Sequence, residues 1–181
     1  RGKIAINLDE GDALVNAELT NGERDIMLFA SNGKAVRFDE GTVRAMGRTA
    51  TGVRGMKLAK GEEVRSLIVI RGEGDILTAS ERGYGKRTEV AEFPKKGRGT
   101  QGVIALKTTE RNGQLVGAIQ LSDHHDVLLI SDGGTLVRTP AADISQVGRN
   151  AAGVTLIRLS ADESLQAIER LDVSLDDDGD E

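Results

Sequence analysis

The chain has 181 residues, with 24 Lys and Arg against 29 Asp and Glu, no cysteine, and 23 glycines against two prolines. The lack of cysteine excludes a disulfide framework and thiolate zinc sites. No apolar run approaches the length of a membrane span and no signal segment opens the sequence, so we expect a cytoplasmic protein with no membrane partner. The many glycines predict tight turns rather than a disordered linker.

The net charge of −5 is unevenly distributed along the chain. Residues 172–181 hold six of the 29 acids and no base, which leaves 23 acids against 24 bases in the rest of the chain. This balance makes the body mildly basic and compatible with a polyanionic partner. We expect residues 172–181 to form a disordered acidic tail, and the sequence leaves open whether the tail is a solubility segment or competes with a polyanion.

One sequence frame recurs about every fifty residues, starting at Asp25, Asp75 and Asp126. In each unit a glycine follows the aspartate at offset 8 and an arginine at offset 12. A Gly-Arg pair comes at offset 22, a Gly-Val pair at offset 27 and a basic residue at offset 32. Agreement at so many offsets indicates three copies of one structural unit.

The N-terminal residues fit the same frame. Residues 2–19 align with 52–69, so the chain is expected to begin inside a repeat whose front half is absent. We therefore expect the C-terminal half of a truncated blade over 1–24, followed by three complete blades. The predicted bounds of these blades are 25–74, 75–125 and 126–171.

Each complete unit offers four short runs suited to β-strands. In the first unit these runs are 25–30, 35–38, 52–58 and 64–70. The apolar spacing of 164–173 is compatible with a helix, but its place in the frame predicts a strand. Four strands per unit, repeated along the chain, predict an all-β, propeller-like array in which each blade packs on its neighbours.

Two stretches extend the repeat frame, "RAMGRTATGVRGMKL" and "GYGKRTEVAEFP". Together with the frame they resemble the C-terminal domain of the bacterial DNA gyrase A subunit, from residue 1 to about 171. The resemblance implies a six-bladed β-pinwheel, of which this chain supplies about three and a half blades. The implied function is sequence-nonspecific binding, bending and wrapping of duplex DNA, in support of ATP-dependent negative supercoiling by a type II topoisomerase.

The same resemblance implies partners and cofactors beyond this chain. The three partners would be double-stranded DNA, the remainder of the gyrase A subunit and the gyrase B subunit. The holoenzyme would use ATP and Mg, with no cofactor held in this fragment. The C-terminal domain of the topoisomerase IV A subunit is the nearest alternative, because it shares the blade type. The family's Q-R-R-G-G-K-G box is absent, and its counterpart is "KGRGTQG" at 96–102.

Basic side chains, most of them at the repeated offsets, are the candidate DNA contacts. A protein that bends a duplex without reading its sequence needs cations along a curved face, and small neighbouring residues let a guanidinium approach a phosphate. The candidate DNA-binding residues are Arg37, Arg48, Lys86, Arg87, Lys95, Lys96, Arg98, Arg138 and Arg149. Two other interpretations stay open: a repeated arginine can instead bridge two blades, and the fold can serve as a β-propeller scaffold for protein partners.

No residue pattern predicts catalysis within the chain. No nucleophile is paired with a base that would activate it, and Tyr84 lies in the blade motif, whereas the family's catalytic tyrosine belongs to a separate region. His124 and His125 lie in a polar joint between units and are expected to be solvated. The chain therefore has no nominated catalytic residue, although the parent protein resembles an ATP-hydrolysing topoisomerase.

Overall fold

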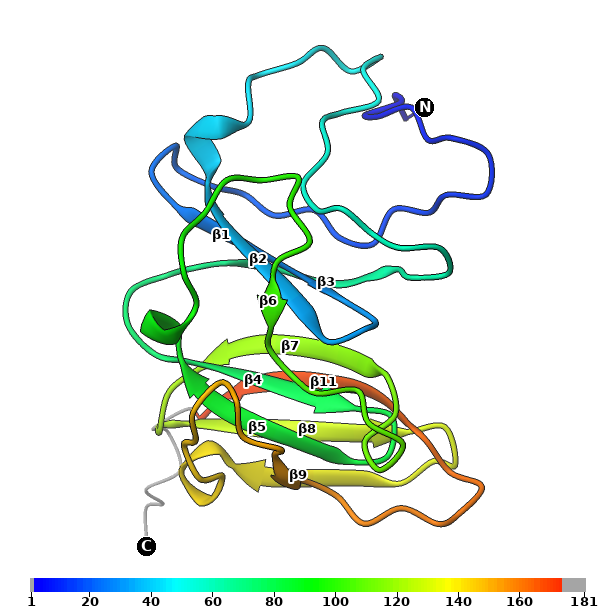
Figure 1. Cartoon of the computed structure of the whole chain (residues 1–181), viewed down its shortest axis with the longest axis vertical. Helices are drawn as coiled ribbons and strands as arrows, with labels where there is room; N and C mark the ends of the chain where they lie inside the picture. Colours follow the sequence, from blue (N-terminus) through cyan, green and yellow to red (C-terminus); the bar gives the residue numbers. More distant parts are fainter. Residues whose placement is uncertain (1, 174–181) are drawn as a thin grey trace, which may run out of the picture.

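Three antiparallel sheets form the body of the computed structural model, which describes residues 2–173 (Figure 1). The strand order is β3-β1-β2-β6 in the first sheet, β10-β5-β4-β7 in the second and β11-β8-β9 in the third. The strands are β1 (Asp25–Ala30), β2 (Lys34–Asp39), β3 (Val64–Val69), β4 (Asp75–Ser80), β5 (Tyr84–Glu89), β6 (Val103–Ile104), β7 (Leu115–Leu121), β8 (His125–Ser131), β9 (Leu136–Pro140), β10 (Val154–Thr155) and β11 (Leu165–Asp172). The prediction of an all-β array of blades is confirmed.

Within residues 2–173, helical structure is limited to one-turn 3-10 helices that follow the second strand of each blade. These are η1 (Glu40–Thr42), η2 (Val90–Glu92) and η3 (Ala141–Asp143). Among the described residues, no helix has the length and apolar character needed to cross a membrane.

A glycine shapes the hairpin turn that opens each blade. Gly83, between β4 and β5, has φ +83°, and Gly134, between β8 and β9, has φ +87°. Residues with a Cβ rarely adopt this left-handed conformation, which explains the glycine at offset 8 of the frame. The turn is closed by the backbone N–H of Gly83, which donates to the carbonyl oxygen of Ser80 (3.0 Å).

The fourth strand of a blade comes from the following unit. β6 pairs with β2 and β10 pairs with β5, so each two-residue strand joins the blade before its own. The carbonyl oxygen of Gly83 also accepts from the backbone N–H groups of Leu156 (2.8 Å) and Ile157 (3.2 Å). Successive blades are thus joined by continuous backbone hydrogen bonding. We call β6 and β10 the exchanged strands.

The prediction that 52–58 is a strand of its own blade is wrong. Its counterparts, β6 and β10, leave their own unit to pair with the preceding one. Residues 52–58 make only an isolated bridge, from Met56 to Thr100, because a strand needs a partner edge and residues 2–24 form no strand. The strand predicted over 164–173 is confirmed as β11.

The predicted acidic tail falls mostly on residues that the structure does not describe. Asp172 still belongs to β11, and the remaining acids of the tail, within 174–181, lie outside the described residues.

Two apolar layers fill the space between the blades. The first lies between the first two sheets and contains Phe29 and Phe93, whose rings meet edge to face with centroids 6.4 Å apart. The second lies between the second and third sheets and contains Leu77 and Leu129, both with no exposed surface. A third cluster, which includes Phe38 and Met56, lies within the first unit. Neighbouring blades thus bury apolar faces against each other, as the array predicts.

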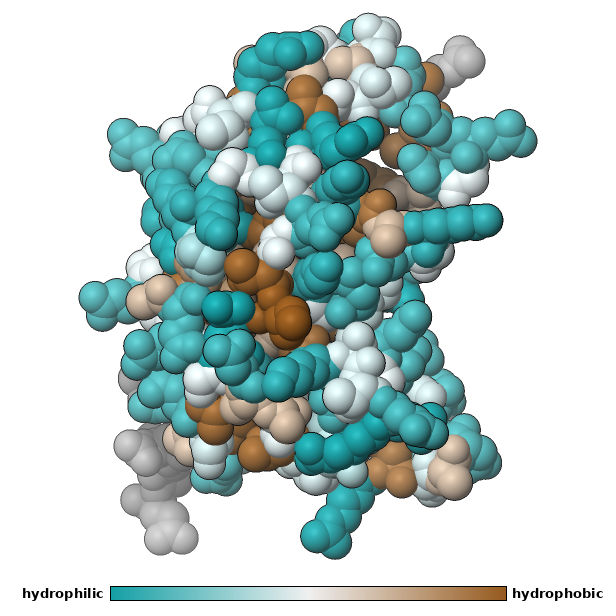
Figure 2. Space-filling view, viewed as in Figure 1, coloured by the Kyte–Doolittle hydropathy of each residue, from teal (hydrophilic) through white to brown (hydrophobic). Residues whose placement is uncertain are grey.

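The two edges of the blades have different surroundings. We call the edge formed by β3, β7 and β11 the inner edge, because these three strands lie side by side (Figure 1). The opposite, outer edge carries the exchanged strands. On β9 the described residues supply no exchanged strand, and Leu136 there is 62% exposed. Figure 2 shows a mostly hydrophilic face, with a small hydrophobic patch over β6 where the first two blades meet.

Replacing Gly83 with Ala should destabilise the fold far more than replacing Gly134. Both glycines have positive φ, so each Ala carries the same backbone strain of about 1–2 kcal/mol. A Cβ on Gly83 would lie 2.4 Å from the carbonyl oxygen of Ile157, whereas a Cβ on Gly134 meets nothing within 4 Å. We expect an additional loss of about 1–3 kcal/mol for Gly83→Ala in urea unfolding. Equal losses for the two variants would contradict the strand exchange.

Candidate nucleic-acid interface

An aspartate and an arginine of the repeat frame fasten each blade to the next. Asp25 starts β1 and Arg37 lies on β2, so the hairpin brings the two side chains together. Arg37 contacts the Asp25 carboxylate through Nε (2.9 Å) and Nη2 (2.8 Å). Its Nη1 donates to the carbonyl oxygens of Val90 and Phe93 in the second blade, at 3.1 Å each. One guanidinium thus joins two blades, and we call this contact the blade latch.

Arg87 forms the same latch between the second and third blades. Its Nε lies 2.5 Å from Asp75 and its Nη2 2.6 Å from Asp123, while Nη1 donates to the carbonyl oxygen of Ala141 (2.9 Å). Burial by itself lowers the pKa of this guanidinium, but the hydrogen bonds to Asp123 and Asp75 outweigh it and raise the pKa. Every guanidinium nitrogen is committed to the protein, and the side chain is only 9% exposed.

A residue at offset 20 of the next unit completes each latch. The Nζ of Lys95 lies 2.7 Å from Asp25, and Gln146 at the same offset donates to Asp75 (2.9 Å). Burial raises the pKa of the Asp25 carboxyl group, yet the hydrogen bonds from Lys95 and Arg37 bring it below its usual value. Lys95 remains 48% exposed, so it belongs both to the latch and to the surface.

The structure places three candidate DNA contacts inside the protein. Arg37 and Arg87 lie between blades, and Lys86 has no exposed surface. Arg138 pairs with Asp126 (2.5 Å) but is 58% exposed, because the described residues provide no further blade to cover it. A buried guanidinium needs acceptors on all sides, so the bridging interpretation fits Arg37 and Arg87.

The Gly-Arg loops lie beside the exchanged strands at the outer edge. Arg98 donates from Nε to the carbonyl oxygen of Thr42 (3.1 Å) and from Nη1 to that of Arg54 (3.2 Å). Arg149 donates from Nη1 to the carbonyl oxygen of Ile104 (3.1 Å). Arg54 and Ile104 share offset 29, so the two arginines make equivalent contacts on successive units. Both side chains remain partly exposed.

Further exposed cations accompany these loops. The basic residues at offset 32, just beyond the Gly-Val pair, are exposed in all three units. We define the outer row as the Gly-Arg arginines and the offset-32 residues: Arg48, Arg98, Arg149, Lys57, Lys107 and Arg158. Lys96, next to the second Gly-Arg loop, is also exposed.

Arg111 is a basic residue that the sequence analysis missed. Its guanidinium carbon lies 4.0 Å from the centre of the Tyr84 ring, a cation–π contact that holds the charge at the surface. The offset-32 residues carry a signal in the repeat frame, but Arg111 has no basic counterpart in the other units. Only the fold shows that it lies beside the aromatic ring.

Lys86 is buried directly beneath the third Gly-Arg loop. Its Nζ donates to the carbonyl oxygens of Gly148 (3.5 Å), Arg149 and Ala151 (3.0 Å). Burial, together with the positive charges of Lys107 and Arg149, lowers the pKa of this ammonium group to about 8, although Glu92 acts in the opposite direction. The sequence analysis predicted that Lys86 contacts DNA. In the structure its side chain is buried and points toward the backbone of the 148–151 loop.

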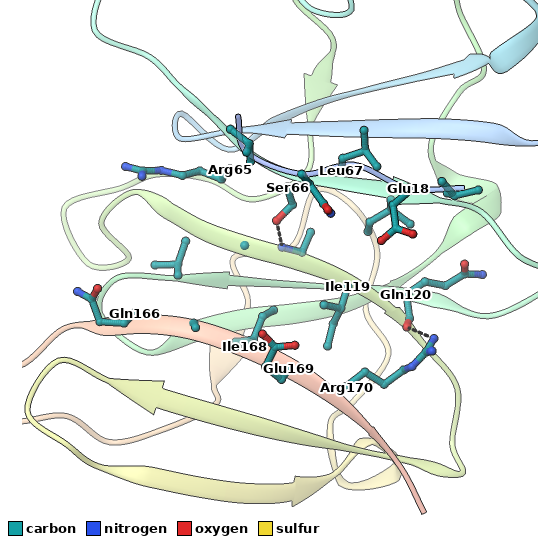
Figure 3. Close-up of a pocket in the computed structure, with 18 of the residues that line it drawn as sticks. Glu18, Arg65, Ser66, Leu67, Ile119, Gln120, Gln166, Ile168, Glu169 and Arg170 are labelled. Atoms are coloured by element: carbon teal, nitrogen blue, oxygen red, sulfur yellow. Dashed lines mark hydrogen bonds between the residues drawn. The ribbon is translucent and has the colours of Figure 1, made fainter. Parts of the chain in front are cut away.

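A cleft of about 590 Å³ opens at the inner edge, between β3, β7 and β11 (Figure 3). Figure 3 shows the charged side chains Glu18, Arg65, Glu169 and Arg170 around this space. Because these charges are of both signs, the cleft is poorly suited to a polyanion. Among residues 2–173 no three His, Cys, Asp or Glu side chains come together in a group that could hold a metal ion.

Residues 1–21, 24–71, 74–122 and 125–172 match the family described as DNA gyrase C-terminal domain, beta-propeller. The chain belongs to this family. The resemblance noted in the sequence is therefore confirmed, and so is the propeller-like fold.

Relatives in this family include the DNA gyrase A subunits of Klebsiella oxytoca, 57% identical, and of Escherichia coli K12, 54% identical. Each match extends over 176 residues and covers 97% of this chain and 20% of the relative. The chain thus spans about a fifth of the length of these relatives.

Two solved structures have closely similar folds. One, described as the DNA gyrase A C-terminal domain, has a TM-score of 0.86 and 29% identity, covering 94% of this chain and 58% of that one. The C-terminal domain of DNA topoisomerase IV has a TM-score of 0.87 and 26% identity, covering 93% of this chain and 53% of that one. Shape alone does not separate the two types of domain, and the curated relatives favour gyrase.

Removing the buried latch arginine should cost far more stability than removing its exposed counterpart. Arg87→Ala leaves the Asp75 carboxylate buried without its partner, which costs about 3–5 kcal/mol. Arg138→Ala removes an equivalent pair in which the guanidinium is 58% exposed and the Asp126 carboxylate 15% exposed, and it should cost only about 1 kcal/mol. Thermal or urea unfolding of both variants measures the difference. A small loss for Arg87→Ala would show that the latch does not hold the blades together.

Proposed function

We propose that this chain binds duplex DNA along its outer edge, with the outer row as the set of phosphate contacts. The observation that carries the proposal is the equivalence of Arg98 and Arg149, each tied to the same backbone position of the preceding unit. Because the blades repeat, these cations recur along one edge at intervals set by the stacking of the sheets. A repeated row of cations along a curved edge matches the regular phosphates of a bent duplex.

The contacts favour binding without sequence preference. Arginine and lysine side chains at an exposed edge neutralise phosphates and release counterions, which contributes affinity but no base readout. The chain has three Phe, one Tyr and no Trp, too few for the stacking platforms that single-strand binders use. Double-stranded DNA is therefore the favoured ligand, and the energy of binding would offset the cost of bending it.

The wider setting of this activity follows from the family. The relatives are subunits of DNA gyrase, so we propose that the chain works in the cytoplasm with the remainder of the gyrase A subunit, together with the gyrase B subunit. There it would wrap DNA and support negative supercoiling, with ATP and Mg used elsewhere in the holoenzyme. The exposed candidates Arg48, Lys95, Lys96, Arg98, Arg138 and Arg149 remain proposed DNA contacts.

The salt dependence of binding tests the outer row directly. Replacing Arg48, Arg98 and Arg149 together with Ala should weaken binding to any duplex. It should also reduce the slope of log K against log salt by up to about three, roughly one for each phosphate that is no longer neutralised. Fluorescence anisotropy with two duplexes of unrelated sequence, at several salt concentrations, gives both quantities.

The matched control is a triple variant with the same change in charge at the inner edge. Arg65, Arg71 and Arg170 line the cleft between β3, β7 and β11, opposite the outer row. Their replacement with Ala should leave the salt slope within about one of the wild-type value. If the two triple variants lose equal slope, binding depends on overall charge and the outer row is not the contact surface.

A further inference from the structure

A buried lysine supports one of the proposed DNA-binding loops from within. The backbone N–H of Ala151 donates to the carbonyl oxygen of Gly148 (3.0 Å), which closes a turn over 148–151. The Nζ of Lys86 donates to three carbonyl oxygens of this turn, those of Gly148, Arg149 and Ala151. An ammonium group has three donors, so each N–H has an acceptor. We propose that Lys86 is a positioning residue that holds the 148–151 turn in the conformation that presents Arg149 to a phosphate. This inference rests on the proposed function.

The other blades show that the fold does not need a lysine at this position. Val36 and Val137 occupy the place of Lys86 in the first and third units. Val36 is 3% exposed and belongs to an apolar cluster, so an aliphatic side chain fits at this point of the blade. The lysine is therefore not required by the blade fold, and we infer that its role concerns the 148–151 loop that it contacts.

The second and third Gly-Arg loops are held in different ways. Arg98 anchors its own loop with two hydrogen bonds, one of which goes to the carbonyl oxygen of Thr42. Glu92 occupies the place of Thr42 beneath the next loop, and its carboxylate accepts from the backbone N–H of Arg149 (2.6 Å). Lys86 and Glu92 thus hold the backbone of this loop by hydrogen bonds. Among the described residues the Arg149 guanidinium makes one hydrogen bond, which leaves most of its donors for a ligand.

The charges around Lys86 also point to an anionic ligand. Burial is the largest cause that lowers its pKa to about 8, the positive charges of Lys107 and Arg149 act in the same direction, and Glu92 opposes them. A buried ammonium hydrogen-bonded only to neutral carbonyl oxygens is costly to keep charged. A phosphate bound at Arg149 would favour the charged form and strengthen the grip on the turn.

A double-mutant cycle tests whether Lys86 acts through Arg149. Lys86→Val, the residue found in the other two blades, Arg149→Ala and the double variant are compared for binding to a duplex of random sequence at pH 7. Each single change should weaken binding by about tenfold, the effect of one lost charge-assisted hydrogen bond. Arg149→Ala should cost at most about twofold in the Lys86→Val background, because the arginine is already misplaced there. An unchanged tenfold cost in that background would overturn the proposal.

A matched control separates position from charge. Lys107→Val removes a neighbouring cation that is exposed and makes no contact with the turn that the structure records. As a member of the outer row it should weaken binding through the loss of its own phosphate contact, while Arg149→Ala retains its full cost in that background. If Lys107→Val reduces the cost of Arg149→Ala as strongly as Lys86→Val does, the effect is electrostatic and Lys86 does not position the loop.

Amide hydrogen exchange examines the turn without DNA. Lys86→Val should speed exchange over 148–152 at pH 7 and leave the equivalent loop, 97–101, unchanged, because Val36 takes the place of Lys86 beneath that loop. Unchanged exchange over 148–152 in a folded variant would show that Lys86 does not hold the turn. If the wild-type chain fails to bind the duplex, the proposed function fails, and the exchange result still decides whether Lys86 orders the turn.

The pH dependence of binding gives a third readout. Lys86 loses its charge and one donor as the pH rises through about 8, under the influence of Lys107, Arg149 and Glu92. Wild-type affinity for the duplex should therefore fall between pH 7 and 9, and the affinity of Lys86→Val should stay flat over that range. A parallel decline in both proteins would assign the pH effect to another group and contradict the proposal.

Discussion

The exchange of one short strand between neighbouring blades is the constraint on which the rest of the structure depends. Because β6 and β10 join the sheet before their own, no blade can complete its hydrogen bonding alone. The exchange places Gly83 against the carbonyl oxygen of Ile157, where a Cβ has no room. It also carries the Gly-Arg loops across the boundary between units. The repeat seen in the sequence is therefore offset from the structural blade by one strand.

The blade latch reinforces this exchange with charge. Burying the Arg87 guanidinium costs solvation, and the carboxylates of Asp75 and Asp123 together with the carbonyl oxygen of Ala141 offset that cost. The bond to Ala141 crosses to the third blade, so the pair fixes the relative orientation of two sheets as well as contributing stability. Spacing between blades sets spacing between surface arginines. The buried latch arginine therefore helps to fix the position of the exposed Gly-Arg arginines. The regular spacing of the proposed binding edge follows from the packing between blades.

Two kinds of basic residue thus share one repeat but differ in role. At offset 12 the hairpin points each arginine at the aspartate that starts the unit, and Arg37 and Arg87 face the interior because a following blade covers them. The Gly-Arg arginines face outward because the loop that holds them has already left its blade. Lys86 shows that the division is not absolute, since a buried cation can act on the surface through the backbone of the loop it grips.

The sequence by itself determined the repeat, the all-β character, the hairpins and the family, because strand-forming runs, turn glycines and the fixed offsets are local properties. It did not determine the pairing of 52–58 and its counterparts, since a short Gly-Val strand fits its own blade and the preceding one equally well on local grounds. Nor could it separate Arg37 and Arg87 from Arg98 and Arg149, because exposure depends on which neighbouring blade covers a side chain. Only the tertiary structure separates them, because the packing of the blades buries Arg37 and Arg87 against carboxylates and leaves Arg98 and Arg149 at the outer edge.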